Sequence, residues 1–228
     1  MSDETELLKE VLDQQPRFQR KKSVSPFPLE VLTVGHSTLG YESFLSTLRQ
    51  ADITAIADVR SSPYSRHNPQ FNRDTLKSEL RLDGIAYVFL GEELGGRPKR
   101  RDLFCDGVAD YEKMAATPTF AAGLERVVAG AQKYRIAMMC SEHDPTECHR
   151  CLLVGRALHE KNIAVRHILS DRTIVPHSEI ERRLLALSGK TNEDFFENNI
   201  NRLALAYRKR SLAVAYSERK PASDDRPE

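Results

Sequence analysis

Residues 136–153 read IAMMCSEHDPTECHRCLL, and this stretch joins a buried strand to a helix. The apolar run ends at Cys140, a polar loop follows, and Asp144 with Pro145 predicts the start of the helix. Glu147 stands where a capping box places its reciprocal residue. The loop therefore precedes a helix N-terminus, where backbone N–H groups and the helix dipole attract anions.

Strand-like and helix-like segments alternate outward from this stretch. Short apolar runs predict strands at residues 31–35, 53–59, 85–90, 135–139 and 164–169. Apolar residues at helical spacing predict helices at residues 41–50, 74–82, 120–133, 144–161, 177–187 and 193–207. This order predicts an α/β protein with a three-layer Rossmann-like fold, a mainly parallel sheet of about five strands, and additional C-terminal helices.

The two ends of the chain differ from its middle in composition. Residues 1–28 are predicted to form a flexible N-terminal arm, because two prolines near its end favour extended chain. We expect the α/β domain over residues 29–190, a C-terminal helical extension over 191–218, and a disordered tail over 219–228.

Composition limits the class of protein. The 228 residues are 40% hydrophobic, enough for a substantial core, and no window approaches the roughly 20 unbroken apolar residues of a membrane span. The acidic first residues lack a signal-peptide core, so we expect a cytoplasmic protein with no membrane partner. A net charge of +1 commits the chain to no acidic partner, and no oligomeric state follows from the sequence.

Polar residues follow four of the predicted strands at the point where each strand ends. Parallel strands bring their carboxyl ends to one edge of the sheet, and ligands bind at that edge. We therefore expect one site built from the loops that begin with Gly35-His36-Ser37, Asp58-Val59-Arg60, Gly95-Gly96-Arg97 and Cys140-Ser141-Glu142.

Several short motifs carry these polar residues: GHS at 35–37, DVR-x2-P-x-S at 58–65, Phe71, LGG at 94–96, and C-x-E-x5-C-H-R at 140–150. Together they resemble the domain-of-unknown-function family 488, over roughly residues 31–169. The resemblance implies a compact α/β domain. It implies no reaction, since the family's name records none.

Acid–base chemistry is the first interpretation of these strand tips. Asp58 and Arg60 leave a strand two residues apart, so both side chains point the same way and Arg60 could clamp a phosphate. Asp58 and Glu142 would then act as acid and base, with His36 beside them. The alternatives are an ion pair of Asp58 with Arg60 that fixes the loop, backbone contacts for Glu142, and a scaffold role for His36.

Cys140 invites a second interpretation, as a nucleophile, because a helix N-terminus lowers the pKa of a thiol. However, nine residues separate it from Arg150, whereas a phosphatase-type loop has five. Cys148 and Cys151 have a metal-ligand spacing, but no second pair accompanies them, so we predict core packing and no metal. A metal-dependent thiol site that uses Cys140, Cys148, Cys151 or His149 remains the alternative.

The other candidates bind substrate rather than transform it. The polar loop at residues 61–73 offers aromatic rings beside positive charge, which suits a nucleobase. The glycine pair before Arg97 lets the backbone approach a ligand closely. The expected binding residues are Ser37, Arg60, Tyr64, Ser65, Phe71, Gly95, Gly96, Arg97, His149 and Arg150.

The absence of two common nucleotide-binding motifs limits the reactions that we expect of this chain. No G-K-[ST] loop and no G-x-G-x-x-G after the first strand occur, which argues against ordinary NTPase or dinucleotide-cofactor chemistry and leaves any cofactor unnamed. The favoured hypothesis is an enzyme that performs hydrolysis or group transfer on a phosphate-bearing or nucleotide-like substrate. The rival hypothesis is a non-catalytic module that binds nucleic acid, with an affinity that falls steeply with salt.

Overall fold

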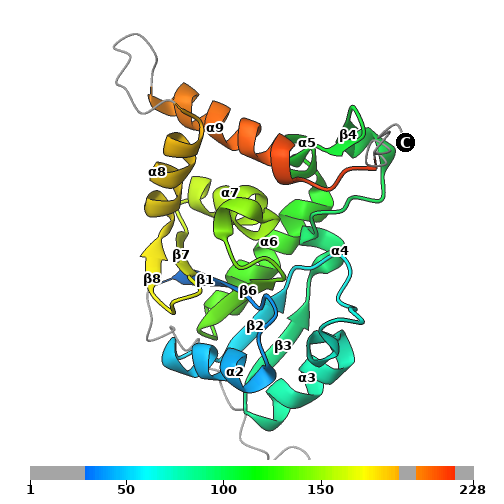
Figure 1. Cartoon of the computed structure of the whole chain (residues 1–228), viewed down its shortest axis with the longest axis vertical. Coiled ribbons are helices and arrows are strands. Elements are labelled where there is room, and N and C mark those ends of the chain that lie inside the picture. Colours follow the sequence, from blue (N-terminus) through cyan, green and yellow to red (C-terminus); the bar gives the residue numbers. More distant parts are fainter. Residues whose placement is uncertain (1–28, 190–198, 219–228) are drawn as a thin grey trace, which may run out of the picture.

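The computed structural model describes residues 29–189 and 199–218 (Figure 1). One sheet has the order β3-β2-β6-β1-β7-β8, with bounds Glu30–Gly35 (β1), Ala55–Asp58 (β2), Ala86–Phe89 (β3), Ile136–Cys140 (β6), Ala164–Ile168 (β7) and Ile174–Pro176 (β8). Strands β3, β2, β6, β1 and β7 are parallel. The predicted α/β fold with a mainly parallel sheet is confirmed. The short edge strand β8, antiparallel to β7, was not predicted.

Helices cover both faces of the sheet. Met139 of β6 packs in the core with α2 (Tyr41–Gln50) and α3 (Arg73–Leu82), whereas its neighbour Met138 packs on the opposite face with α6 (Pro118–Ala131). Successive side chains of a strand point to opposite faces, so a strand buried on both sides needs an unbroken apolar run. This explains the IAMMC sequence of β6 and its position inside the sheet.

The long connection after β3 contains structure that the sequence analysis missed. Its elements are the helices α4 (Gly91–Leu94), η2 (Arg101–Leu103) and α5 (Tyr111–Ala115) and the two-stranded ribbon of β4 (Phe104–Cys105) and β5 (Val108–Ala109). Each is too short to show a periodic pattern. Asp110 caps α5 by accepting hydrogen bonds from two backbone N–H groups. The connection carries Arg97 and Tyr111 to the carboxyl edge of the sheet.

The continuous helix predicted over residues 144–161 is wrong. A 3₁₀ turn, η3 (Pro145–Glu147), ends at Cys148, whose backbone is extended (φ −135°, ψ 137°). A π-helical segment, η4 (Arg150–Gly155), then leads into α7 (Arg156–Glu160). Asp144 does cap the first turn through the N–H of Thr146, but Glu147 makes no capping box, because it pairs with Arg210 at 2.8 Å.

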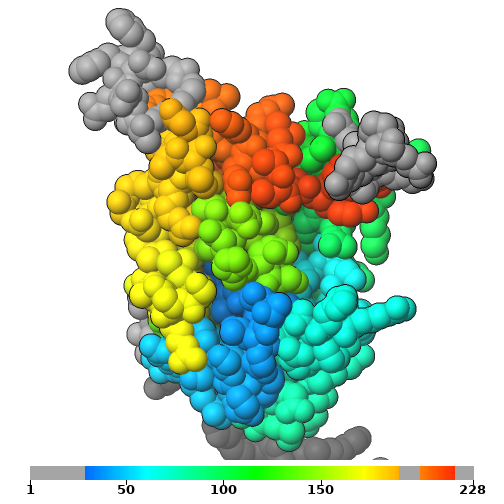
Figure 2. Space-filling model, in the orientation of Figure 1, coloured from blue at the N-terminus to red at the C-terminus, as the bar shows by residue number. Residues whose placement is uncertain are grey.

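Helices α8 (His177–Leu187) and α9 (Asn199–Val214) complete the described chain. Helix α8 has the predicted bounds, and α9 extends past the predicted end at residue 207. Arg210 donates to the carbonyl of Thr146, and Figure 2 shows α9, in orange to red, against the lime-green segment that contains η3 and η4. Within the described residues, no helix combines the length and apolar character that a membrane crossing requires.

The predicted arm and tail, and the start of the last predicted helix, lie outside the described residues. The division into an α/β domain and a helical extension stays a prediction. A further 3₁₀ turn, η1 (Pro69–Phe71), lies in the polar loop after β2 and anchors that loop through the buried ring of Phe71.

Candidate functional site

A cavity of about 160 Å³ opens at the carboxyl edge of the sheet, where β6 ends between β1 and β2. Its walls come from the loops after β2, β3 and β6, from η3 and the residues that follow it, and from the C-terminal end of α9. Of the predicted site residues, the cavity brings together Arg60, Gly96, Arg97, Cys140, Glu142 and His149. The other predicted residues do not line this cavity, although several support those that do.

Asp58 and Arg60 form a buried ion pair behind the cavity wall. Arg60 donates through Nε and Nη2 to the two carboxylate oxygens of Asp58, at 2.9 and 2.7 Å, and Tyr87 donates to the same carboxylate at 2.7 Å. Asp58 is completely buried and does not line the cavity. The geometry therefore matches the alternative in which Asp58 orients Arg60, and it leaves no oxygen of Asp58 facing a substrate.

His36 supports the same arginine from the end of β1. Its Nδ1 lies 2.8 Å from the Ser37 carbonyl, which can only accept, so Nδ1 carries the proton and Nε2 accepts from Arg60 at 3.2 Å. Burial, with the nearby charge of Arg60, lowers the pKa of His36 to about 4. The ring is thus neutral at pH 7 and stacks on Phe71 at 4.0 Å. Phe71 is 1% exposed, which leaves no free face for the nucleobase that the sequence suggested.

Ser37 and the loop after β2 also serve the scaffold. Ser37 has a left-handed backbone (φ 48°) and donates its N–H to the carbonyl of Ser141, which ties the first strand tip to the fourth. Ser65 accepts from the backbone N–H groups of His67 and Asn68, both at 3.2 Å. Tyr64 is 59% exposed and lies outside the cavity wall.

Arg150 is a buried cation that holds the loop after β6. Its guanidinium donates to the carbonyls of Glu142 and His143, the latter at 2.9 Å. The side chain is completely buried, its Nε has no hydrogen-bond partner, and no carboxylate of the described chain pairs with it. The positive charge of Arg150 acts on the nearby thiols, because it acts to lower the pKa of both Cys140 and Cys148, and its backbone N–H donates to Cys148 Sγ at 3.5 Å.

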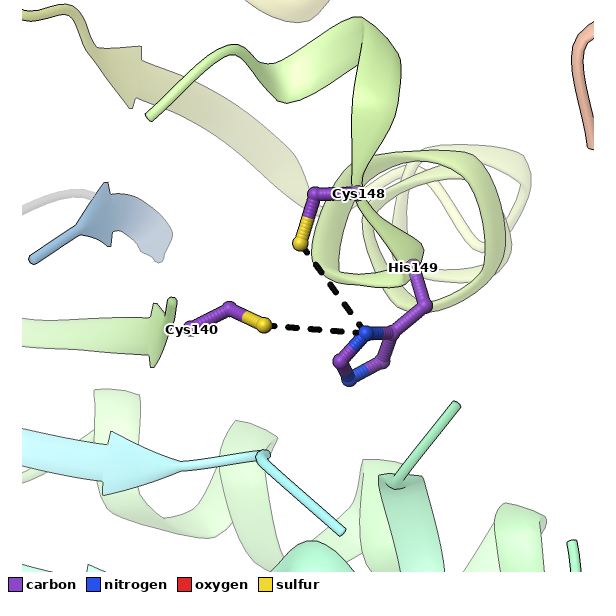
Figure 3. Close-up of side chains that lie close together, drawn as sticks. All are labelled: Cys140, Cys148 and His149. Carbon is purple, nitrogen blue, oxygen red and sulfur yellow. Dashed lines mark hydrogen bonds between the residues drawn. The ribbon is translucent and has the colours of Figure 1, made fainter. Parts of the chain in front are cut away.

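Two cysteines and a histidine meet at the cavity wall (Figure 3). We call Cys140, Cys148 and His149 the cavity triad. His149 Nδ1 lies 3.6 Å from Cys140 Sγ and 3.9 Å from Cys148 Sγ, and the three atoms lie within 4.8 Å of one another. His149 Nε2 donates to the carbonyl of Val59 at 2.8 Å, so Nδ1 is the ring nitrogen that faces both sulfurs. Cys148 reaches this position because its extended backbone interrupts the helix.

The thiols of the cavity triad share a charged environment. Burial disfavours a thiolate at Cys148, yet the thiol of Cys140, the guanidinium of Arg150 and the ring of His149 together hold the pKa of Cys148 well below its ordinary value. The hydrogen bond to Cys148, with burial, raises the pKa of Cys140. Burial opposes protonation of His149, but the neighbouring Cys148 raises the pKa of that ring. The two thiols therefore titrate as a coupled pair, in which Cys148 is the more acidic member.

The glycine pair and the charged residues shape the rest of the cavity. A Cβ on Gly96 would lie 2.7 Å from Cγ of His149, and one on Gly95 would lie 2.3 Å from Oγ of Ser61. These glycines thus permit close packing of the loop on His149 and Ser61, where the sequence suggested close approach of a ligand. Arg97 is exposed at the cavity, with its guanidinium carbon 5.2 Å from the ring centroid of Tyr216. Glu142 is also exposed there.

A second group of cysteine and histidine joins β7, α8 and α9. We call His167, His177 and Tyr207 the buried histidine chain. His167 Nδ1 bonds Thr33 Oγ1 at 2.8 Å, its Nε2 bonds His177 Nδ1 at 2.9 Å, and His177 Nε2 bonds the Tyr207 hydroxyl at 2.8 Å. Cys151 Sγ lies 3.9 Å from His167 Nε2. All four ring nitrogens therefore already have a partner within the protein.

Cys148 was a site residue only in the metal-dependent alternative, and Tyr111 and Tyr216, which also line the cavity, were not predicted. The sequence analysis assigned Cys148 to an apolar helix face, which required an unbroken helix. The C-x7-C-H spacing was the available signal, because it brings a second thiol and an imidazole to the loop after β6. No comparable signal marked the two tyrosines, which reach the cavity from α5 and from the end of α9.

The cavity triad is capable of two kinds of chemistry. A thiolate beside an imidazole is a nucleophile with a proton carrier. Two thiolates and an imidazole nitrogen are also three ligands for a soft or borderline metal ion. Arg97, exposed in the same cavity, adds positive charge that favours an anionic substrate, whereas the charge of Arg60 is balanced by Asp58.

Comparison with known proteins adds the family. A family model described as "Domain of unknown function DUF488" matches residues 40–157, which is just over half of the chain. The match spans the motifs at 58–65, 94–96 and 140–150 and begins after the GHS motif at 35–37. Neither the curated proteins nor the solved structures gave a significant match.

Proposed function

Because the chain belongs to the DUF488 family, whose name records no activity, we propose a function from the site itself: hydrolysis or group transfer on a phosphate-bearing substrate. The observation that carries this proposal is the cavity at the carboxyl edge, in which the cavity triad and two arginines share one wall. Catalysis needs reactive groups and charge-binding groups around the same hollow, and this cavity has both.

The size of the cavity limits what enters it. A volume of about 160 Å³ is smaller than the roughly 300–1,000 Å³ of pockets that enclose a whole drug-sized ligand. It accommodates a phosphate group while the remainder of the substrate stays outside. The exposed loop with Tyr64 begins at Ser61 and Ser62, which line the cavity, so a nucleotide-like remainder would meet an aromatic ring near the mouth.

Each part of the site has a role in this proposal. Arg97 binds the phosphate directly, and Arg60 does so with its orientation fixed by Asp58 and His36. The cavity triad supplies the reacting centre. Glu142, exposed in the cavity and carried on the loop that Arg150 holds, exchanges protons with the nucleophile and the leaving group.

The test uses the full chain with p-nitrophenyl phosphate and bis(p-nitrophenyl) phosphate. We expect release of p-nitrophenolate that inorganic phosphate inhibits and that Glu142→Gln lowers by about 100-fold or more without loss of folding. Glu147→Gln is the matched control, since Glu147 lines the same cavity but pairs with Arg210, and it should leave turnover within about threefold of the unmodified protein.

Two results would overturn the proposal. The first is no turnover of either ester or of nucleoside monophosphates by the folded protein. The second is retention of single-stranded DNA with a steep salt dependence but without turnover, which would replace the enzyme by a non-catalytic nucleic-acid binding module.

A further inference from the structure

We propose that Cys140, Cys148 and His149 bind a zinc ion whose fourth position opens into the cavity. The inference deepens the proposed function, because it names the reacting centre of the same site, and it rests on that function for the use of the open position. It is carried by the three donor atoms, which come from the end of β6 and from the break between η3 and η4 and converge on one point (Figure 3).

The spacing of the donor atoms fits one small ion. Tetrahedral zinc, with Zn–S of about 2.3 Å and Zn–N of about 2.0 Å, holds sulfur and nitrogen roughly 3.5 Å apart and two sulfurs roughly 3.8 Å apart. His149 Nδ1 lies 3.6 and 3.9 Å from the two sulfurs, and all three atoms lie within 4.8 Å of one another. The two nitrogen-to-sulfur distances thus lie within about 0.4 Å of the tetrahedral value, and side-chain shifts of less than about 1 Å would complete the coordination.

The imidazole of His149 has the orientation and the hydrogen bond that are typical of a metal-binding histidine. A ligating histidine almost always donates its other ring N–H to a carboxylate, a carbonyl or water, and this bond fixes the tautomer. His149 Nε2 donates to the Val59 carbonyl at 2.8 Å. On its other side, Gly96 packs against the ring so closely that a Cβ would collide with it. The imidazole is therefore held on both sides with Nδ1 directed at the sulfurs.

The charges around the donors balance with zinc in place. Two thiolates neutralise a Zn²⁺ ion, so the centre itself would carry no net charge. The buried guanidinium of Arg150 holds the loop that follows Cys140, through the carbonyls of Glu142 and His143, and within the described chain no carboxylate pairs with it. The loaded centre together with Arg150 has one net positive charge, which favours a bound hydroxide and an approaching phosphate.

The site has three protein ligands, as catalytic zinc sites do, and the fourth coordination position is left open. No other His, Cys, Asp or Glu in the described residues joins the cluster, whereas structural zinc sites have four protein ligands. Cys140, Cys148 and His149 all line the cavity, so the fourth position is reached from it. A water molecule bound there has a pKa lowered towards 7 and becomes a nucleophile.

The reaction balances with water as the only co-reactant. The zinc-bound water gives a proton to the carboxylate of Glu142, and the remaining hydroxide oxygen forms a bond to phosphorus. The bond between phosphorus and the leaving oxygen breaks, and that oxygen keeps the electron pair and takes the proton from Glu142. One water is consumed, one phosphoester bond is cleaved, and nothing is oxidised or reduced.

The test is elemental analysis of the full chain, prepared under reducing conditions, incubated with zinc and then desalted. We expect about one zinc per chain and tight binding of cobalt with sulfur-to-metal charge-transfer bands. Cys140→Ser and Cys148→Ser should each lower zinc retention at least about tenfold. Cys151→Ser and Cys105→Ser are matched controls outside the cavity triad, and both should retain the metal.

The outcomes separate this inference from the proposed function. Absence of zinc in the reconstituted protein, or equal loss in Cys151→Ser and Cys140→Ser variants with unchanged circular dichroism, overturns the zinc site. Phosphoester hydrolysis that persists after complete removal of metal overturns zinc as the reacting centre but keeps the proposed function. Stoichiometric zinc without any turnover keeps the site and removes the proposed function.

Discussion

The cavity triad and the buried histidine chain, which has Cys151 beside it, both bring imidazole and thiol groups together but differ in how their donor atoms are used. In the buried histidine chain, Thr33, the two imidazoles and Tyr207 satisfy one another through three hydrogen bonds of 2.8 to 2.9 Å. In the cavity triad, only Nε2 of His149 is occupied by a protein oxygen, and its Nδ1 faces two thiols.

This difference separates a structural cluster from a reactive one. Polar groups that are buried and fully hydrogen-bonded stabilise a fold and offer no free atom to a ligand. In the cavity triad the donor atoms contact one another only through long sulfur contacts of 3.6 and 3.9 Å, and they line a cavity beside an arginine that no carboxylate of the described residues pairs with, so they are available for chemistry. Composition alone does not distinguish the two clusters, since each brings together cysteine and histidine.

The largest expected effect concerns acid and the buried histidine chain. Burial, reinforced by the neighbouring His159, lowers the pKa of His177 to about 3, and Glu181, His167 and Tyr207 also face this ring. Below pH 6.5 the unfolded chain binds a proton at this histidine, whereas the folded chain does so only near pH 3. The contribution of neutral His177 to the free energy of unfolding is therefore fully present above pH 6.5, and it is lost as the pH drops towards 3.

The loss expected from His177 alone is about 1.4 kcal/mol per pH unit, or about 3 kcal/mol between pH 6.5 and 4.5, and the buried His36 and His167 add losses of the same sign. Urea unfolding at both pH values measures it. In His177→Gln, the pH dependence should decrease by the equivalent of one proton, while zinc retention at pH 7 stays unchanged. An identical pH dependence in the variant and the unmodified protein would contradict a structural role for this neutral histidine.

A smaller effect is expected on the zinc affinity of the cavity triad when the loop that packs on His149 is changed. In Gly96→Ala, the new Cβ would lie 2.7 Å from Cγ of His149 and push the imidazole away from its position between Val59 and the sulfurs. We expect zinc affinity to fall by about tenfold, as it does when a supporting contact of a metal ligand is lost. Competition with a chelator of known affinity measures this change.

Gly40→Ala provides the matched control, because a Cβ at Gly40 meets no atom within 4 Å. It should leave zinc affinity unchanged. Equal affinities for Gly96→Ala and Gly40→Ala would show that close packing of the loop on His149 does not position the ring.

Sequence patterns predicted the elements whose structure is set locally. The apolar run of β6 and the helical spacing of α2 and α8 are continuous, so their bounds were found to within about one residue. The helix predicted over 144–161 failed because its break at Cys148 depends on contacts that are distant in sequence. Arg210 of α9 bonds both the Thr146 carbonyl and Glu147, and Cys148 meets Cys140.

The same reason limits prediction of the site. The rule that parallel strands share a carboxyl edge placed Arg60, Cys140 and Glu142 around one cavity. It did not reveal that Asp58 would be fully paired and buried, because that depends on Tyr87 and on the depth of the strand end. Nor did it identify Cys148, whose role requires a backbone conformation that no local propensity indicates.

The most direct test of the zinc site at the cavity triad is a crystal structure of the full chain grown with zinc, with diffraction data collected on both sides of the zinc absorption edge. We expect one anomalous peak at about 2.3 Å from each of Cys140 Sγ and Cys148 Sγ and about 2.0 Å from His149 Nδ1, with the fourth ligand of the ion in the cavity. A peak at Cys151, His167 and His177, or no peak at the cavity wall, would contradict it.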